Sequence, residues 1–369
     1  MWKRFVQAFT LAFFRAVSRV FPPVPGPLPR DPSLILVFSC TGIGDALFQG
    51  GAIRSLKKAY PQARIVVCAH HKRRTIALHH PDVAEVVSYG KSPRYALGLL
   101  WKFRWNRPGI VVLLNTNKEV LPLAYCINRR ALFGPLWRSE PYTFLLSHPV
   151  DAPNRGHMTA RMMRVAEAAG GLPGDSSMVY APTEEERSAV RQRFAGWIEK
   201  PFIIFQTGGG TTLGWRNWPV EAYIRAIRWL NERYDLAVVL TGGRDNEPQA
   251  TAIESACPGV INLCSKTTLE ETAALLTFTR LLVSSDTGVM HLAFAVKCPT
   301  VSIHHYLIPA SDVGPLDRSS GRHEVIELAR KNPASPTPES MEGIPDEEVW
   351  AAIERLLARG GVAPRPVGA

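Results

Sequence analysis

The amino-terminal segment of this sequence lacks a hydrophobic run long enough to cross a bilayer, and the cysteines lack the spacing of a metal site. The longest uncharged stretch in that segment, residues 5–14, has ten residues, whereas a membrane-spanning helix needs about 20. The six cysteines are scattered and form no CxxC pair, so neither a zinc site nor a disulfide framework is expected. This cysteine usage indicates a reducing compartment.

Acidic residues are scarce in the first half of the chain. Residues 1–181 contain 24 Lys and Arg against 9 Asp and Glu, a balance of +15, whereas residues 182–369 contain 19 against 23, a balance of −4. We therefore expect an anionic partner for the first half: a phosphorylated substrate, an anionic membrane or a nucleic acid. No nucleic-acid recognition module accompanies the charge, so nucleic acid is not the expected partner.

Residues 1–21 have the periodicity of an amphipathic helix. Its apolar face comprises Trp2, Phe5, Val6, Phe9, Phe13, Ala16, Val17 and Val20. Basic and polar residues fall mainly on the other face, which is typical of a helix that lies in a membrane interface. The alternative is a helix that packs on the protein itself. Arg15 and Arg19, with the lack of a small-x-small cleavage site, argue against a signal peptide. A stiff proline-rich linker follows at residues 21–29.

A β-α-β unit with a glycine-rich first turn follows the linker. Its strands are predicted at residues 33–38 and 63–69, with a helix at 46–60 between them. The turn lacks the third glycine of a dinucleotide fingerprint, because Leu47 stands there, and it also lacks the GK[ST] of a P-loop. The turn instead brings Asp45 to the helix start, at the carboxyl edge of the sheet. Asp45 is either a partner of the helix dipole or a general base.

A run of basic residues, His71 to Arg74, follows the second predicted strand and therefore reaches the same edge of the sheet. Such a cluster is suited to a phosphorylated acceptor, although charged loop residues are more often simply solvated.

The second half repeats the β/α alternation and has two further polar turns at carboxyl strand ends. A strand at residues 202–206 runs into a turn with three glycines and three threonines, which suits contact with phosphate. Arg216 adds a guanidinium that can bind phosphate through two hydrogen bonds. A strand at residues 281–284 runs through Ser285 to His291 into a helix, so backbone amides and the helix dipole form a candidate anion site. The alternative there is an ordinary capped helix. No DxD cluster for a metal is present.

Three sequence blocks resemble the signatures of glycosyltransferase family 9, the ADP-heptose:lipopolysaccharide heptosyltransferases. The blocks are GIGDALFQGGAIRSLKKAYPQARI, TGGGTTLGWRNWP and SSDTGVMHLAFAVKCPTVSI. The resemblance implies the GT-B fold, an α/β architecture in which two Rossmann-like domains face each other across a cleft. It also implies an inverting glycosyltransferase that needs no metal or other cofactor and takes a nucleotide-sugar donor, with ADP-heptose preferred.

The resemblance also assigns roles to individual positions. It makes Asp45 the general base that deprotonates the acceptor hydroxyl. The implied donor-binding residues are Thr207, Thr211, Thr212, Arg216, Glu247, Thr267, Asp286, Thr287, Gly288 and His291. We also expect Gly44 and the basic residues His71, Lys72, Arg73 and Arg74 to bind the acceptor. Arg216 stands where the family commonly has Lys, which keeps the charge and changes its geometry.

We expect an amphipathic helix and linker at residues 1–30, an acceptor-binding domain at 31–180, a nucleotide-sugar-binding domain at 181–342, and a helix and tail at 343–369. The predicted enzyme moves heptose or a related sugar to a lipopolysaccharide-core-like acceptor. Its partners would be the nucleotide sugar, a lipid-linked phosphorylated glycan and the anionic inner face of the cytoplasmic membrane, with a monomer favoured. The alternatives are a relative with another donor sugar or acceptor, such as a surface polysaccharide or a protein, and a non-catalytic, membrane-associated GT-B module.

Overall fold

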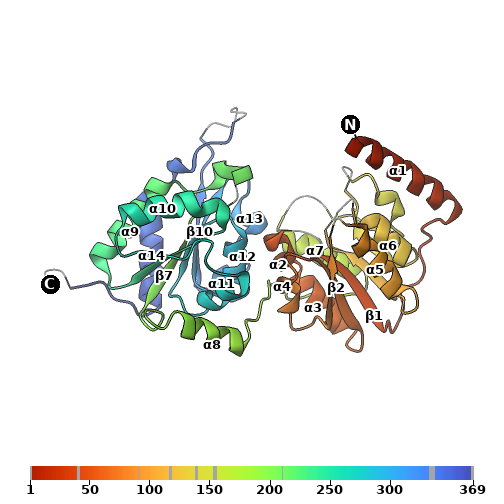
Figure 1. The fold of residues 1–369 in the computed structure, drawn as a ribbon, viewed down its shortest axis with the longest axis horizontal. Coiled ribbons are helices and arrows are strands. Elements are labelled where there is room, and N and C mark those ends of the chain that lie inside the picture. Colours follow the sequence, from red (N-terminus) through yellow and green to blue (C-terminus); the bar gives the residue numbers. More distant parts are fainter. Residues whose placement is uncertain are drawn as a thin grey trace. The chain divides into compact units, whose positions relative to one another are not determined.

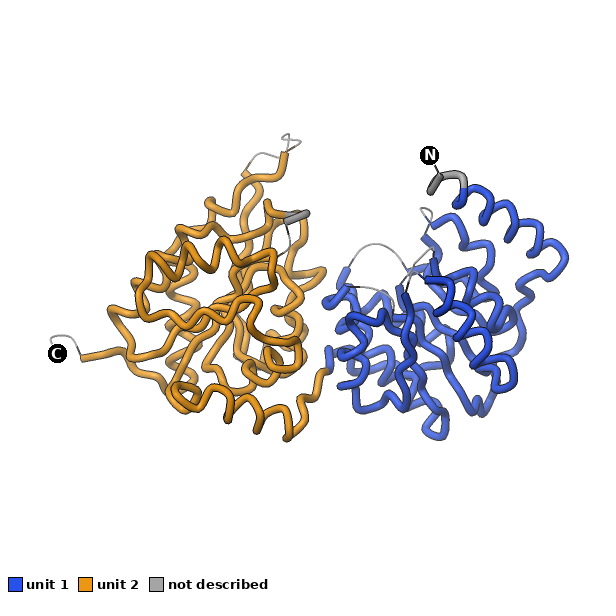
Figure 2. The backbone as a smooth tube through the Cα atoms, viewed as in Figure 1, with its two compact units in different colours: residues 1–179 blue, residues 180–369 orange. Residues whose placement is uncertain are grey.

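The structure is a computed structural model of the full chain. The residues that it describes are 2–39, 42–90, 92–115, 119–137, 140–152, 156–209, 211–331 and 337–366, without the side chains of residues 2–5 and 211–213. The chain divides into two compact units, residues 1–179 and 180–369 (Figure 2). This boundary lies inside the proline-bounded stretch 173–182, which the sequence marks as a connection.

The first unit is built on a six-stranded parallel sheet with the strand order β3-β2-β1-β4-β5-β6 (Figure 1). Its strands are β1 (Leu34–Ser39), β2 (Arg64–His70), β3 (Glu85–Tyr89), β4 (Ile110–Leu113), β5 (Leu132–Pro135) and β6 (His148–Val150). The strands β1, β2 and β4 are almost entirely buried, as expected for a parallel sheet covered on both faces. This order is that of a Rossmann sheet.

The helices of the first unit follow the strands in β/α alternation. They are α1 (Trp2–Val20), α2 (Ile43–Phe48), α3 (Gly50–Ala59), α4 (Thr75–Leu78), α5 (Pro93–Phe103), α6 (Leu121–Ile127), η1 (Thr143–Leu145) and α7 (Met158–Ala168). Buried residues of α5, α6 and η1 share one hydrophobic cluster with β1 and β4. The helices α3 and α7 pack against each other.

The single helix predicted at residues 46–60 is instead two helices, α2 and α3, which meet at Gln49. At the junction the amide of Gln49 donates to the carbonyl of Ala46, three residues back, which tightens the turn between the two helices. A Cβ on Gly51 would lie 2.5 Å from the Cα of Ser176, so only glycine lets this helix approach the segment after α7.

Helix α1 packs on the protein along one side, and several residues of its predicted apolar face are exposed. Leu11, Phe14 and Val17 contact the cluster formed by α5, α6 and η1. The ring of Phe14 meets Tyr125 and Tyr142 edge to face. The other apolar side is open, with Phe9 65% exposed and Phe13 53% exposed. The interpretation of a helix that packs on the protein therefore holds for one side of α1, and the membrane interpretation stays a prediction. In the part of the chain that the structure describes, no helix has the length and hydrophobicity needed to span a membrane.

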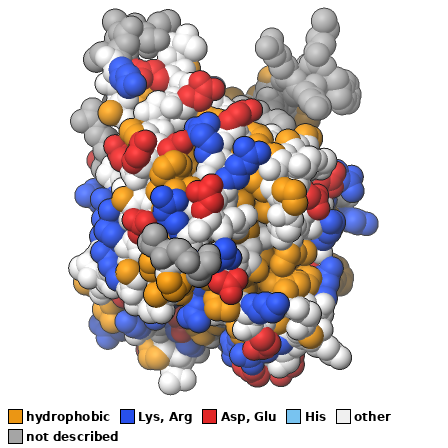
Figure 3. Space-filling model, turned by 90° about the vertical axis from the view of Figure 1, so that its left-hand side faces the viewer, with side chains coloured by type: hydrophobic (Ala, Val, Ile, Leu, Met, Phe, Trp, Pro, Cys, Tyr) orange, Lys and Arg blue, Asp and Glu red, His pale blue; other side chains and the backbone are white. Residues whose placement is uncertain are grey.

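The second unit has another six-stranded parallel sheet, in the order β12-β11-β10-β7-β8-β9. Its strands are β7 (Phe202–Gln206), β8 (Ala237–Thr241), β9 (Ile261–Asn262), β10 (Leu282–Ser285), β11 (Thr300–His305) and β12 (His323–Leu328). Five of these strands, β7 to β11, begin and end within two residues of the strands predicted from the sequence at residues 202–206, 236–241, 260–263, 281–284 and 300–303. In the face shown in Figure 3, basic and acidic side chains are interspersed, in keeping with the near balance of charge in this half of the sequence.

Helices and short turns complete the second unit. They are α8 (Glu184–Arg193), η2 (Thr211–Arg216), α9 (Val220–Arg233), η3 (Arg244–Asn246), α10 (Glu247–Ala256), α11 (Leu269–Leu276), α12 (Gly288–Ala295), α13 (Ala310–Val313), η4 (Arg318–Ser320), η5 (Met341–Gly343) and α14 (Asp346–Arg359). Buried residues of α9, α10 and α14 share one cluster with the sheet. The helices α8, α11 and α12 form a second group, in which α11 contacts both of the others.

Candidate functional site

The turn between β10 and α12 holds Asp286, the most buried carboxylate among the described residues of the second unit. Asp286 follows the last residue of β10 and is 4% exposed. Thr287 caps α12, because its hydroxyl accepts a hydrogen bond from the amide of Met290 at 3.2 Å. Gly288 opens the helix. The capped-helix interpretation therefore holds for Thr287, and the positive end of α12 lies at Asp286.

Two basic side chains converge on Asp286 from different elements. Nη1 of Arg216, at the end of η2, lies 2.8 Å from one carboxylate oxygen. Nε2 of His291, in the first turn of α12, lies 3.2 Å from the other. Burial by itself raises the pKa of a carboxyl group, but the hydrogen bond with His291 and the charge of Arg216 hold the pKa of Asp286 below its ordinary value. The structure thus joins three predicted donor-binding residues into one charged cluster.

His304 is a fourth member of this neighbourhood that the sequence analysis did not identify. The pairing of Ser285 with Ile303 places β11 directly beside the end of β10. His304 is fully buried, and at most one of its two ring nitrogens has a hydrogen-bond partner among the described residues, the backbone of Ile308. Burial lowers the pKa of His304 to about 4, so this ring is neutral at pH 7. A buried, unpartnered ring nitrogen beside a charged cluster can bind a polar group of a ligand.

The glycine-rich turn after β7 is held by two asparagine side chains. Gly208 has a φ of +126°, which favours glycine. Asn217 accepts a hydrogen bond from the amide of Gly209 at 2.8 Å. Asn246, which is buried in η3, donates to the carbonyl of Gly209 at 3.2 Å. The hydrogen bond from Asn246 therefore joins the turns after β7 and β8, next to the guanidinium of Arg216. Neither asparagine was identified from the sequence.

Replacing Asn217 with Ala should loosen this turn. The change leaves the backbone amide of Gly209 without its side-chain partner, so we expect the free energy of unfolding to fall by about 1–2 kcal/mol. Affinity for a phosphate-bearing ligand should fall several-fold, because Arg216 lies against this turn. Denaturant titration and ligand titration measure the two effects. Asn231→Ala, on the exposed side of α9, is the matched control, and equal behaviour of both variants would contradict the proposed role.

The other predicted donor-binding residues follow strands of the same sheet, and two of them use their hydroxyl groups locally. The hydroxyl of Thr207 donates to the carbonyl of Thr241 at 3.2 Å, so it fastens β7 to β8. Glu247 is exposed at the start of α10. The hydroxyl of Thr267 lies 3.0 Å from that of Thr272, just before α11. Thr211 and Thr212 belong to η2, and their side chains lie outside the described part of the structure.

In the first unit, Asp45 lies on α2 at the carboxyl edge of the sheet. It is half-buried, and one carboxylate oxygen accepts a hydrogen bond from the amide of Gly42 at 3.4 Å. This long bond caps the helix and leaves the carboxylate further capacity to accept hydrogen bonds or a proton. Gly44 precedes Asp45 in the same helix. One turn later, Gln49 is fully buried, and its side-chain amide has no partner among the described residues.

The predicted basic cluster lies beside α2. It follows β2 and leads into α4, which contacts α2. The ring of His71 stacks on Tyr95 at a centroid distance of 5.6 Å. Lys72, Arg73 and Arg74 are exposed. Asp45, Gly44 and this cluster therefore occupy one edge of the first sheet. In the described residues, no group of three or more His, Cys, Asp or Glu side chains is arranged to hold a metal ion.

Comparisons with known proteins match this architecture. Residues 107–326 match the family described as glycosyltransferase family 9 (heptosyltransferase). Lipooligosaccharide heptosyltransferase 2 of Haemophilus influenzae is 24% identical, over 88% of this chain and 99% of the relative. A solved glycosyltransferase family 9 protein from Veillonella parvula superimposes with a TM-score of 0.76 at 18% identity, covering 89% and 98% of the two chains. ADP-heptose lipopolysaccharide heptosyltransferase II of Escherichia coli gives a TM-score of 0.74 at 23% identity, covering 89% and 99%.

These findings confirm the predicted family and the GT-B fold with its two Rossmann-like units. The matched range contains both carboxyl-terminal blocks and the Arg216–Asp286–His291 cluster, and it begins after Asp45. Because it spans more than half of the sequence, the chain is a glycosyltransferase that belongs to family 9, the heptosyltransferase family.

Proposed function

We propose that this enzyme transfers heptose from ADP-heptose to a lipopolysaccharide-core-like acceptor, with inversion at the anomeric carbon and without a metal. The observation that carries the proposal is the charged cluster of Arg216, Asp286 and His291 at the positive end of α12. Such a cluster provides the fixed charge that a nucleotide-sugar donor requires. The names of the relatives, which are heptosyltransferases of lipopolysaccharide or lipooligosaccharide, favour heptose and this class of acceptor.

The proposed chemistry is a direct displacement. Asp45 takes the proton of the acceptor hydroxyl, whose oxygen forms the new bond to the anomeric carbon as the bond to the diphosphate breaks. The diphosphate leaves with its electron pair. Arg216 and the amides that begin α12 stabilise that negative charge. Asp286 and His291 orient the guanidinium and the donor, so they are binding residues in this scheme rather than the base.

Transfer assays with purified protein test the proposal. ADP-heptose and a heptose-deficient lipopolysaccharide core should give product with the opposite anomeric configuration, detected by NMR. A thermal-shift screen against ADP-, UDP-, GDP- and CDP-sugars identifies the donor. Transfer with another sugar nucleotide alone would favour the alternative donor. Nucleotide binding without transfer to any acceptor would favour a non-catalytic module.

We further propose that the enzyme works at the cytoplasmic face of the inner membrane, where its lipid-linked acceptor would be made. The support is α1, whose exposed side carries Phe9, Phe13 and Val20, with Val20 71% exposed. Aromatic and aliphatic side chains on one face of a helix that also carries basic residues suit a membrane interface.

Deleting residues 1–29 should release the protein from anionic liposomes in a co-sedimentation assay. The deletion removes the exposed apolar side chains together with the basic residues of α1. It also removes the packing of Leu11, Phe14 and Val17, so the double variant Phe9→Ser/Phe13→Ser provides a test that retains those contacts. Unchanged sedimentation of both variants would contradict the membrane role of α1.

A further inference from the structure

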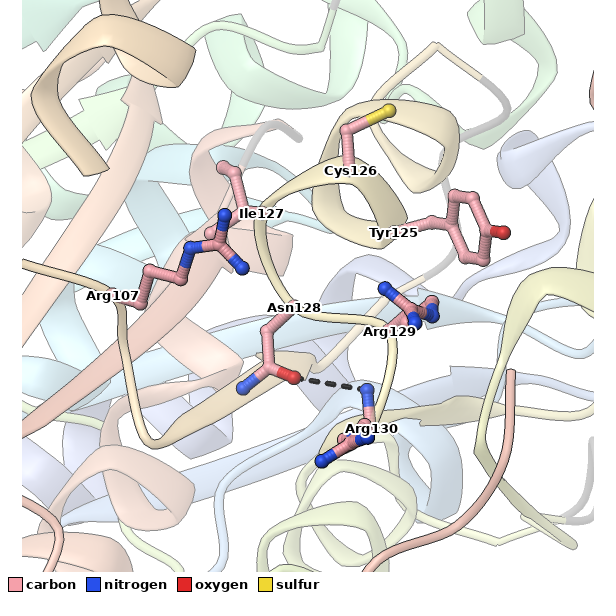
Figure 4. A pocket seen from close by; sticks show the side chains of 7 residues that line it. All are labelled: Arg107, Tyr125, Cys126, Ile127, Asn128, Arg129 and Arg130. Carbon is pink, nitrogen blue, oxygen red and sulfur yellow. Dashed lines mark hydrogen bonds between the residues drawn. The ribbon is translucent and has the colours of Figure 1, made fainter. Parts of the chain in front are cut away.

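Three arginine side chains line a hollow of about 410 Å³ in the first unit, which we call the arginine pocket (Figure 4). Arg107 comes from the segment before β4, and Arg129 and Arg130 come from the turn between α6 and β5. The remaining lining residues are Tyr125, Cys126, Ile127 and Asn128. The lining therefore carries three positive charges and no carboxylate.

Among the three guanidinium groups, that of Arg129 lies over the ring of Phe21, 5.7 Å from the ring centroid. Asn128 uses its side chain locally: it donates to the carbonyl of Pro108 at 2.8 Å and accepts from the amide of Arg130 at 2.9 Å. In the described part of the chain, none of the three arginines forms an ion pair with an acidic residue. An anion in this hollow would offset the three positive charges, and phosphate is an anion that guanidinium groups bind through paired hydrogen bonds.

The arginine pocket lies at the opposite sheet edge from Asp45. Arg107 precedes β4, and Arg129 and Arg130 precede β5, so all three lie at the amino-terminal ends of parallel strands. Asp45 follows β1 and lies at the carboxyl ends. The pocket is therefore separate from the acceptor residues assigned above.

The proline-rich linker forms a second hollow against the same arginines. This hollow, about 280 Å³, is lined by Pro22, Val24, Pro25 and Gly26 together with Arg129 and Arg130. The linker is fixed there, because the amide of Gly26 donates to the carbonyl of Arg130 at 3.1 Å. The neighbouring apolar side chains are exposed: Phe21 is 53% exposed and Val24 is 55% exposed. Apolar side chains thus border the basic hollows.

A second apolar surface lies on α5 and the turn that follows it, before β4. Trp101 and Trp105 are 68% and 85% exposed, and the guanidinium of Arg104 stacks over the ring of Trp101. Helix α5 belongs to the same face of the sheet as α6, on which α1 packs. Exposed aromatic side chains beside arginines are suited to the boundary between lipid headgroups and acyl chains.

We propose that the arginine pocket binds the phosphate of an anionic phospholipid headgroup while the exposed apolar side chains of α1, α5 and the linker enter the bilayer surface. The pocket would then fix the orientation of the first unit on the membrane, which α1 alone would not do. The phosphodiester of phosphatidylglycerol is the chemistry that the three guanidinium groups would recognise. This inference concerns membrane binding only and does not depend on which sugar is transferred.

The test uses the full chain and vesicles of phosphatidylcholine with or without phosphatidylglycerol. The triple variant Arg107→Gln/Arg129→Gln/Arg130→Gln should lose roughly a hundredfold in affinity for the phosphatidylglycerol vesicles, since each basic residue near an anionic surface contributes about a factor of five. The matched control is Lys200→Gln/Arg280→Gln/Lys297→Gln. These three exposed cations each lie shortly before a strand of the second sheet, at its amino-terminal edge. The control should change affinity less than tenfold. Equal losses in both variants would overturn the proposal.

Two further experiments distinguish a specific phosphate pocket from diffuse charge attraction and from a site for soluble phosphate. The variant Arg107→Lys/Arg129→Lys/Arg130→Lys keeps the charge but loses the paired hydrogen bonds. It should therefore bind the phosphatidylglycerol vesicles clearly more weakly than the wild type does. Full retention of affinity would overturn the pocket. Inorganic phosphate or glycerol 3-phosphate at millimolar concentration should not displace the protein from vesicles, and displacement would indicate a site for soluble phosphate instead. Transfer to a soluble acceptor should be unchanged in the glutamine variant, which distinguishes this result from a failure of the proposed catalysis.

Discussion

Replacing Asp45 with Asn should lower kcat by about 10²- to 10⁴-fold and leave donor affinity within about twofold. The range is that expected when a positioned general base is lost. Asn retains an oxygen that can accept the hydrogen bond from the amide of Gly42, so the start of α2 should stay capped. Initial rates of transfer and isothermal titration with the donor measure the two quantities.

Asp45→Ala separates catalysis from capping. Alanine removes both the base and the cap, so it should lose as much activity as Asn and, in addition, about 0.5–2 kcal/mol of stability. A fully folded Asn variant that turns over like the wild type would remove Asp45 from the mechanism. A loss of activity that follows the loss of stability, present in Ala and absent in Asn, would assign Asp45 a capping role only.

Replacing Arg216 with Gln should reduce kcat/KM by about 10²- to 10³-fold, the effect of removing one preorganised group that stabilises charge in the transition state. The guanidinium lies 2.8 Å from Asp286 and against the turn at Gly209, at the place where a leaving diphosphate would gain charge in our scheme. The variant should also bind ADP more weakly. Steady-state kinetics and ADP titration test both expectations.

Arg216→Lys is the matched comparison, since family members commonly have lysine at this position. Lysine keeps the positive charge, so activity should stay within about tenfold of the wild type. A Lys variant as inactive as Gln would show that the fork of the guanidinium, rather than its charge, is required. A fully active Gln variant would exclude Arg216 from diphosphate binding.

Local sequence patterns predicted most of the sheet in the second unit but less of it in the first. The strand at residues 202–206 was predicted with the bounds that β7 has, because a continuous apolar run between turns is unambiguous. Strands β3, β5, β6 and β12 were not predicted. Glycine and proline interrupt β5, and a proline lies in the middle of β6. Most residues of β3 and half of β12 are only partly buried, so their apolar patterns are weak.

The sequence by itself determined which residues reach the carboxyl ends of strands, because a strand followed by a polar turn and a helix places the turn there. Asp45, Arg216 and Asp286 were all found in this way. The sequence also determined the family, through the three motif blocks. These features depend on neighbours in the chain, which periodicity and turn chemistry report directly.

Only the tertiary structure decided which of these residues meet. Arg216 and Asp286 are 70 positions apart, and they touch because β7 and β10 are adjacent in the sheet. His304 and Asn246 became visible as site residues because β11 lies beside β10 and β8 lies beside β7. The arginine pocket likewise joins Arg107 to the turn at Arg129 and Arg130 because β4 pairs with β5. Strand order follows from how the crossover helices pack on the sheet, and a local pattern of residues carries no record of that packing.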